Sequence, residues 1–254
     1  MTTNRTPRSI YTLLQGLFLR LYYRLVALNY QRELLATNQQ TVGGTVKSFE
    51  LYNRHGNDAM LQDIERHCSA DSTIIDIGAN VGIYALALAA GQPNRRILAI
   101  EPVPEVYAQL AKNVHLNGFS DRIAMLPCCV GEKSGDTHFF VSTFSELSGR
   151  SEESASRWGA KVSRQVTVAM KRLDTIVKES SPPDIVKIDV EGSAADVLQG
   201  GTETLERHQP IVFLELHTEE LTADEPAVCQ QLLESAGYSI TDRGDYWVAR
   251  ASPT

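Results

Sequence analysis

Two kinds of hydrophobic spacing alternate along most of the chain. Short runs of consecutive apolar residues are typical of strands buried on both faces, whereas apolar residues three or four positions apart are typical of helices. This alternation predicts an α/β fold with a mainly parallel sheet and helices on both faces. The apolar runs lie at residues 74–77, 96–100, 122–130, 184–190 and 211–216. Helical spacing covers residues 82–89, 104–117, 173–179, 193–207 and 224–236, with an interruption at Gly200 and Gly201.

Shorter patterns complete this outline. Residues 239–241 and 246–249 read as two strands joined by a polar turn, which predicts a closing antiparallel hairpin. Residues 137–141 and 165–170 are further strand candidates, and the second alternates polar and apolar side chains like an exposed strand. Between them, residues 142–163 are polar, serine-rich and weakly periodic, which predicts a loop or mobile lid.

The N-terminal part of the chain has a different pattern. Residues 9–36 predict a long amphipathic helix, and residues 45–52 alternate like a strand that leads into the rest of the chain. We therefore divide the chain into an N-terminal segment, 1–44, and a domain, 45–254. The apolar residues at helical spacing are Ile10, Leu13, Leu14, Leu17, Phe18, Leu21, Tyr22, Leu25 and Leu28, and the basic residues are Arg5, Arg8, Arg20, Arg24 and Arg32.

Three uses of the helix at residues 9–36 remain open. Arg20 and Arg24 interrupt its apolar run, so it is not expected to span a membrane. It also lacks the uninterrupted apolar region and the small-residue cleavage site of a signal peptide. The helix could pack on the domain as a lid, form a homodimer with a second subunit, or make peripheral contact with an anionic membrane.

Composition excludes some functions and leaves others open. The 254 residues are 43% hydrophobic and 22% charged, which is ordinary for a globular protein. The net charge of -7 argues against general nucleic-acid binding, which favours basic surfaces. The four cysteines, at positions 68, 128, 129 and 229, contain no C-x-x-C pair and suggest no disulfide framework. A reducing, cytoplasmic compartment is therefore expected.

The clearest chemical signal follows the strand at residues 74–77. This strand runs into a glycine-containing turn and then a helix, a corner that binds nucleotides in many α/β proteins. Asp76 selects between two ligand classes, because a carboxylate here would repel a pyrophosphate but suits the positive amino group of S-adenosylmethionine. The pattern D-x-G-x-N-x-G also lacks the third glycine of a dinucleotide site. The residues expected to form this donor corner are Asp76, Gly78, Ala79, Asn80, Gly82 and Tyr84.

A second acid lies where such a corner needs one. Glu101 ends the strand that begins at residue 96, about 20 residues beyond the glycine turn, where nucleotide-binding units place a carboxylate for ribose hydroxyls. Pro102 keeps Glu101 in an extended conformation at the strand tip. Glu101, Pro102 and Asp189 complete the residues expected to bind the donor. Ligands bind at the carboxyl ends of parallel strands, where Asp76, Glu101, Asp189 and His217 all fall.

These strings together resemble the FkbM-type methyltransferases. The matching segments are DIGANVGIYALALA from Asp76, EPVPEVYAQLAKNVHLNG from Glu101, DIVKIDVEG from Asp184 and PIVFLELH from Pro210. The resemblance implies a class I methyltransferase (Rossmann-like) fold, S-adenosylmethionine as donor, and O-methylation of a hydroxyl on a sugar, glycan or natural product. It also places Asp189, Glu191 and Gly192 beside the transferred methyl group. Where the family often has E-G-x-E, this chain has Ala194, which puts any substrate or metal role of that position in doubt.

Methyl transfer to a hydroxyl needs positioning and removal of one proton. Asp189 is the best candidate to accept a hydrogen bond from the acceptor hydroxyl, and Glu191 could assist or hold the amino group of the donor. Lys187 shares a strand face with Asp189, so a structural ion pair is an equal alternative for these two residues. His217 is a second candidate base, with Glu215 on the same face. These acids and His217 could bind a divalent cation, but their spacing is not a metal motif, and no metal is assigned.

Two other function classes stay open. A nicotinamide-dependent oxidoreductase would share the alternating fold, but its glycine fingerprint is missing and Asp76 opposes its pyrophosphate. A protein that binds the donor without catalysis would keep Asp76 and Glu101, and Ala194 is the feature that leans this way. The expected partner is a small-molecule or glycan acceptor.

Overall fold

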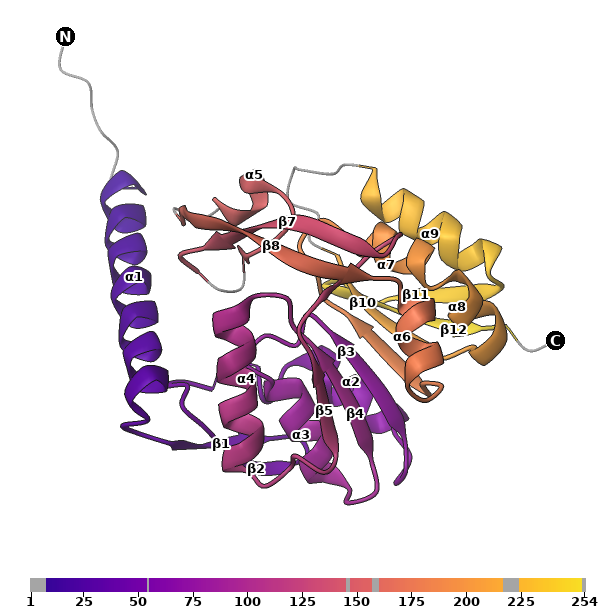
Figure 1. The fold of residues 1–254 in the computed structure, drawn as a ribbon, viewed down its shortest axis with the longest axis horizontal. Coiled ribbons are helices and arrows are strands. Elements are labelled where there is room, and N and C mark those ends of the chain that lie inside the picture. Colours follow the sequence, from indigo (N-terminus) through magenta and orange to yellow (C-terminus); the bar gives the residue numbers. More distant parts are fainter. Residues whose placement is uncertain (1–7, 54, 145–146, 157–159, 217–223, 253–254) are drawn as a thin grey trace, which may run out of the picture.

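The computed structural model describes residues 8–53, 55–144, 147–156, 160–216 and 224–252. Its centre is a seven-stranded sheet in the order β11-β12-β10-β9-β3-β4-β5, seen nearly edge-on in Figure 1. The strands are β3 (Thr73–Ile77), β4 (Arg96–Ile100), β5 (Ile123–Leu126), β9 (Ile185–Ile188), β10 (Ile211–Glu215), β11 (Tyr238–Asp242) and β12 (Tyr246–Ala251).

The direction of these strands confirms the predicted class I methyltransferase architecture. From β10 through β9, β3 and β4 to β5, every neighbouring pair is parallel. β12 runs antiparallel to both of its neighbours, β10 and β11, and forms the closing hairpin. The strand order reverses between β9 and β3, and ligands of open α/β sheets bind at such a point beyond the carboxyl ends of the strands.

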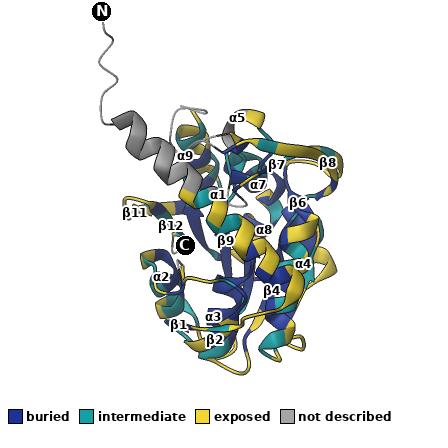
Figure 2. Ribbon diagram, turned by 90° about the vertical axis from the view of Figure 1, so that its left-hand side faces the viewer, coloured by how far each residue is buried: buried dark blue, intermediate teal, exposed yellow. Residues whose placement is uncertain are grey.

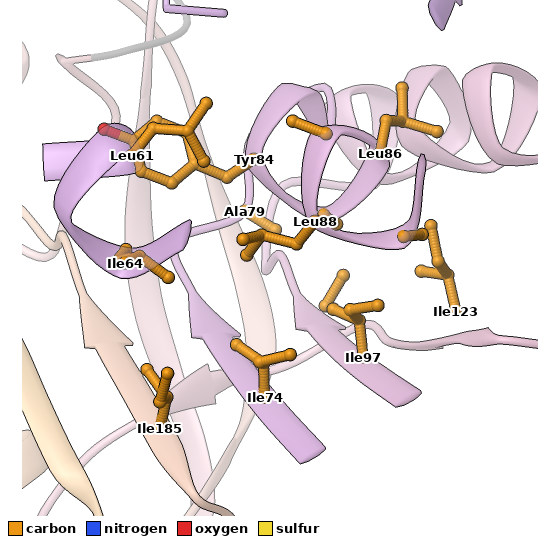
Figure 3. Close-up of a cluster of buried hydrophobic side chains, with 14 of the residues drawn as sticks. Leu61, Ile64, Ile74, Ala79, Tyr84, Leu86, Leu88, Ile97, Ile123 and Ile185 are labelled. Carbon is orange, nitrogen blue, oxygen red and sulfur yellow. The ribbon is translucent and has the colours of Figure 1, made fainter. Parts of the chain in front are cut away.

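Helices cover both faces of the sheet. On one face, α2 (Ala59–His67) and α3 (Ile83–Gly91) pack on Ile74, Ile97 and Ile185, as Figure 3 shows. The opposite face carries Ile75, Val186 and Leu214 and is covered by α6 (Leu173–Glu179), α7 (Ala194–Gly200), α8 (Thr202–His208) and α9 (Glu225–Ser235). Alternate residues of β3 and β9 therefore point into different cores, which explains their continuous apolar runs. The remaining helix of the sheet layer, α4 (Pro104–Leu116), follows β4.

The prediction of one continuous strand over residues 122–130 is wrong. This segment divides into β5 and β6 (Cys129–Val130), and the two belong to different sheets. Pro127 lies between them and has no N–H group to continue the ladder. β6 joins a small sheet with β7 (Gly135–Ser142) and β8 (Val162–Lys171), in the order β6-β8-β7.

The segment between β7 and β8 contains more structure than its polar sequence predicts. It includes the short helix α5 (Glu152–Ala155) and an apolar cluster of Phe144, Leu147 and Ala160. Residues 145–146 and 157–159 lie outside the described part. This segment lies above the carboxyl ends of the central strands, between α1 and α9 in Figure 1.

The N-terminal helix α1 (Arg8–Arg32) is shorter than predicted. Glu33 adopts a left-handed conformation, with φ of 49°, and ends the helix. A hairpin of β1 (Thr37–Thr41) and β2 (Gly44–Ser48) follows, and the sequence pattern predicted only its second strand. The division into residues 1–44 and 45–254 remains our proposal. The boundary falls within this hairpin, so that β1 on one side of it pairs with most of β2 on the other. Within the described residues, no helix is long and apolar enough to span a membrane.

Polar side chains fasten α1 to the rest of the molecule. Tyr30 is fully buried, and its hydroxyl accepts a hydrogen bond of 2.7 Å from Asn113 Nδ2 of α4. Asn113 also donates to the Val81 carbonyl oxygen at 2.8 Å, and its Oδ1 accepts from the Phe49 N–H at 3.2 Å. One amide therefore joins α1, the end of β2 and the turn before α3.

We expect Asn113→Ala to lower the free energy of unfolding by roughly 2–4 kcal/mol, because it leaves buried backbone groups of Phe49 and Val81 without partners. Urea unfolding followed by circular dichroism measures this. Asn38→Ala, at an exposed position of β1, is the matched control and should change stability by less than about 0.5 kcal/mol. Equal losses in the two variants would contradict the assignment.

Candidate functional site

A cavity of about 670 Å³ opens at the carboxyl ends of the central strands. Its floor is formed by the turn after β3 and by the ends of β4, β9 and β10. Side chains from α1, β7 and the segment after β7 line its other side. Residues of these three parts that line it include Tyr23, Val26, Ala27, Phe139, Val141, Ser142, Thr143, Leu147, Ser148, Gly149 and Arg150.

The turn between β3 and α3 is held against the neighbouring strands. The N–H groups of Gly78 and Ala79 both donate to the Ile100 carbonyl oxygen at 3.0 Å. Gly78 has φ of 77°, and a Cβ at this position would lie 1.9 Å from the carbonyl oxygen of Asp189. Only glycine satisfies both the conformation and the close approach to β9. Gly82, with φ of 88°, caps α3, and a Cβ there would lie 2.3 Å from Leu110 Cδ1.

Glu101 is fixed at the tip of β4, beside this turn. Its Oε2 accepts a hydrogen bond of 3.0 Å from the Asn80 N–H, and its Oε1 accepts one of 2.9 Å from the Val103 N–H. Burial raises the pKa of Glu101 to about 7, although these two bonds favour the charged form. A carboxylate that lines the cavity in this position suits the hydroxyls of a ribose.

Lys187 lies between two carboxylates. In the register of β9 and β3 it is the direct neighbour of Asp76, and its Nζ is 3.0 Å from Asp76 Oδ1 and 3.2 Å from Asp189 Oδ2. The same Nζ donates to the Gly78 carbonyl oxygen at 3.1 Å and lies 5.0 Å from the centre of the Tyr84 ring. Burial alone would lower the pKa of Lys187, but the two carboxylates raise it above its usual value. Burial raises the pKa of Asp76.

This arrangement differs from the predicted contact of Asp76 with the amino group of the donor. Asp76 is 1% exposed and does not line the cavity, because Lys187 already pairs with it beneath the turn. Asp189, which is one-third exposed, is the carboxylate of this cluster that reaches the cavity. The structural ion pair between Lys187 and Asp189 is therefore present, and it does not exclude a second role for Asp189.

Most of the other predicted site residues line the same cavity. His217 lies outside the described residues, and Gly82 supports the turn from behind. Those that line the cavity are Gly78, Ala79, Asn80, Tyr84, Glu101, Pro102, Lys187, Asp189, Glu191 and Glu215. In the described part of the chain, no three His, Cys, Asp or Glu side chains are placed to hold a metal ion.

The sequence pattern missed a second polar group on the cavity wall. Asp58 caps α2 by accepting the Leu61 N–H at 2.8 Å, and the Tyr84 hydroxyl donates to it at 2.5 Å. His55 Nδ1 lies 3.7 Å from Asp58 Oδ2. Burial opposes the charge of Asp58, but the bonds from His55, Tyr84 and Leu61 outweigh it and lower the pKa. The available signal was Asp58 itself, an acid placed as an N-cap before an apolar periodic segment.

The cavity floor fits S-adenosylmethionine in two independent respects. Glu101 presents a carboxylate at the strand tip, beside the glycine turn. Asn80 Oδ1 is buried and accepts no hydrogen bond within the described structure, so it is a free acceptor beside Glu101. A bound amino group or hydroxyl would satisfy it.

Comparison with known proteins identifies the family. A model of the methyltransferase FkbM domain matches residues 76–240, more than half of the chain. The chain belongs to the FkbM family of methyltransferases. It is therefore an S-adenosylmethionine-dependent methyltransferase, and this assignment decides against the nicotinamide-dependent oxidoreductase.

Individual relatives are distant. Methyltransferase sdnD of Sordaria araneosa is 29% identical over 68% of this chain and 76% of its own length. The 2-O-methyltransferase NoeI of Sinorhizobium fredii is 27% identical over 59% of this chain and 65% of its own. The hexuronic acid methyltransferase AglP of Haloferax volcanii is 26% identical over 70% of this chain and 69% of its own.

The crystal structure of an FkbM methyltransferase from Methylobacillus flagellatus has the same fold. It superposes with a TM-score of 0.51 and 18% identity, over 72% of this chain and 44% of that longer chain. At this identity the likeness concerns the fold alone.

We expect Lys187→Met to lower the free energy of unfolding by roughly 3–5 kcal/mol, because it leaves the buried Asp76 without its counter-ion. Adding Asp76→Asn should recover part of the loss, because it removes the unpaired charge. Urea unfolding measures both. Lys178→Met, which breaks an exposed pair with Glu203, is the control and should cost no more than about 1 kcal/mol. A loss in Lys187→Met as small as this control would show that the buried pair contributes little.

We expect the affinity for S-adenosylmethionine to fall as the pH drops below about 7. Above the pKa of Glu101, about 7, its carboxylate would be charged and would accept hydrogen bonds from the ribose hydroxyls of the donor. Below it, binding must first displace a proton, so the dissociation constant should rise by up to about tenfold per pH unit. Titration calorimetry between pH 5.5 and 8.5 measures this, with the flanking values chosen on either side of that pKa.

Glu101→Gln is the control for this experiment, because the amide keeps the shape and cannot titrate. It should bind more weakly by roughly 1.5–3 kcal/mol at pH 8, the range for hydrogen bonds to a charged group. Its affinity should also lose most of the pH dependence. The same pH profile in both proteins would assign the titration to another group and refute the ribose role.

Proposed function

We propose that this methyltransferase transfers the methyl group of S-adenosylmethionine to a hydroxyl oxygen of a sugar, glycan or natural product. The observation that carries the proposal is the position of Asp189. Its carboxylate lies on the cavity wall next to the donor corner, held at 3.2 Å by the buried Lys187. The names of two relatives, a 2-O-methyltransferase and a hexuronic acid methyltransferase, support an oxygen acceptor on a sugar.

The residues divide the work by position. Glu101 and Asn80 would hold the ribose, and the Gly78–Gly82 turn would admit the donor to the backbone. When bound, S-adenosylmethionine supplies a methyl group on a positively charged sulfur. Asp189 would accept the hydrogen bond of the acceptor hydroxyl and take its proton as the new carbon–oxygen bond forms. Glu191 lines the same wall and would assist this step or hold the amino group of the donor.

Lys187 would act on this step through Asp189. Its ammonium group contacts Asp76, Asp189 and the Gly78 carbonyl oxygen, so it fixes the Asp189 side chain relative to the turn that would carry the donor. Alignment of the acceptor oxygen with the methyl group is the larger part of such catalysis. Lys187 is therefore a positioning residue in this scheme.

The region opposite the donor corner offers an acceptor a polar surface. Ser142, Thr143, Ser148, Arg150 and Arg164 line that side of the cavity. Arg150 pairs with Asp196, and Arg164 pairs with Glu105, so both guanidinium groups have counter-ions. A neutral, hydroxyl-rich acceptor fits this surface better than a strongly charged one. A cytoplasmic location is part of the proposal, and the four cysteines, all of them free thiols, agree with it.

We expect Asp189→Asn to reduce turnover about 10²–10⁴-fold, the usual contribution of a general base, while donor affinity stays unchanged. The measurement is consumption of S-adenosylmethionine against a panel of sugars and lipid-linked glycans, with the methylated product identified by mass spectrometry. Donor affinity is followed by calorimetry in parallel.

Two histidine variants separate the possible bases. His217→Ala tests the other base predicted from the sequence, and His55→Gln tests the imidazole beside Asp58. Loss of turnover in either one, with Asp189→Asn nearly normal, would move the base to that histidine. Normal turnover in all three would leave positioning as the only catalytic contribution. Donor binding with no consumption against any acceptor would favour a donor-binding protein without catalysis.

A further inference from the structure

Helix α1 has two faces of different character. Its inner face packs on the domain through Val26 and Tyr30, and Tyr23 stacks on Phe144 with ring centres 5.1 Å apart. This face also forms part of the cavity wall, through Tyr23, Val26 and Ala27. The helix is therefore fixed in place relative to the site.

The outer face of α1 is apolar and open. We use this name for Phe18, Leu21, Leu25 and Leu28 together with the leucines just after the helix, Leu34 and Leu35. Phe18 is 69% exposed and Leu21 is 57% exposed, and Figure 2 shows exposed positions along the described part of the helix. These six make up most of the large hydrophobic residues that are exposed in the described chain. A contiguous apolar stripe of this kind marks an interaction surface.

Charge identifies the partner. The first 32 residues contain five arginines and no acidic residue, in a chain of net charge -7. Arg24 and Arg32 are exposed, and in the described structure neither forms an ion pair. The first acid, Glu33, is neutralised by Lys112, whose Nζ is 2.8 Å away. In the described part of the segment, the two arginines beside the apolar stripe, Arg24 and Arg32, thus carry positive charge without an ionic partner.

We propose that the outer face of α1 docks on an anionic membrane surface. An apolar stripe flanked by arginines is the arrangement of helices that lie in the interface plane, with leucines below the headgroups and arginines among them. A second copy of the chain would bring arginines against arginines, without acids on this face to pair with them. The helix lies parallel to the bilayer in this mode and does not cross it.

This proposal is independent of the chemistry at Asp189. Because one helix forms both the cavity wall and the docking face, a docked molecule holds its cavity at a fixed place relative to the lipid surface.

The test is co-sedimentation of the full chain with vesicles of phosphatidylcholine alone or of phosphatidylcholine with one-quarter phosphatidylglycerol, at low and high salt. We expect binding to the anionic vesicles that weakens in high salt. The double variant Leu21→Glu/Leu25→Glu should bind the anionic vesicles at least roughly tenfold more weakly than the unaltered chain, since two leucines no longer enter the interface. Arg24→Gln should weaken binding roughly fivefold, the effect of one basic residue near an anionic surface.

Val228→Glu is the matched control, because Val228 is an exposed apolar residue of α9 far from α1 in the fold, and its binding should be unchanged. Calorimetry with S-adenosylmethionine checks that the variants are folded, since neither Leu21 nor Leu25 lines the cavity. No binding by the unaltered chain would overturn the proposal, and so would binding that the double variant retains. A dimer in ultracentrifugation that the double variant dissociates, without vesicle binding, would assign this face to a second copy.

Discussion

The ammonium group of Lys187 is the interaction on which the site depends. A buried charge is tolerated only when it is paired and hydrogen-bonded. Lys187 meets this condition through contacts with two neighbouring strands and one turn, at Asp76, Asp189 and the Gly78 carbonyl oxygen. These contacts connect β3 to β9 at the reversal point of the sheet. The Lys187 side chain therefore holds the turn in place and orients Asp189. It also supplies the counter-ion of the buried Asp76.

Glycine at position 78 is the steric counterpart of this charge cluster. The turn approaches β9 so closely that a Cβ would overlap the Asp189 carbonyl oxygen, and that approach brings the Gly78 carbonyl within reach of Lys187. The two requirements reinforce each other: the ion pairs draw the turn towards β9, and the absent side chain permits the approach. The turn and Asp189 are consequently parts of one rigid unit, which is what the proposed alignment of an acceptor oxygen with a methyl group requires.

Much of this could be predicted from the sequence because it is local. The βα alternation, the glycine turn and Glu101 at a strand tip are set by residues close together in the chain, and the structure has the alternation, the turn and the strand-tip acid. Contacts between residues that are distant in the sequence could not be predicted, because they depend on the order of the strands and the packing of the helices. Asp76 and Lys187 are neighbours only because β9 lies next to β3, and Tyr84 meets Asp58 only because α2 packs beside α3. Pro127 was a local signal that should have divided the strand at residues 122–130.

Helix α1 shows why periodicity alone cannot assign a buried face. Apolar residues recur at helical spacing on more than one side of it, so the pattern predicted an amphipathic helix without saying which side the domain covers. The structure buries Tyr30 and Asn29, and leaves Leu21, Leu25 and Leu28 in solvent. The reason is specific pairing: Tyr30 bonds to Asn113, and Asn29 Nδ2 bonds to the Phe49 carbonyl oxygen at 2.5 Å, contacts that aliphatic side chains cannot replace. Aromatic and polar groups thus hold the helix on the domain, and the leucines that would ordinarily do so are left for a partner outside it.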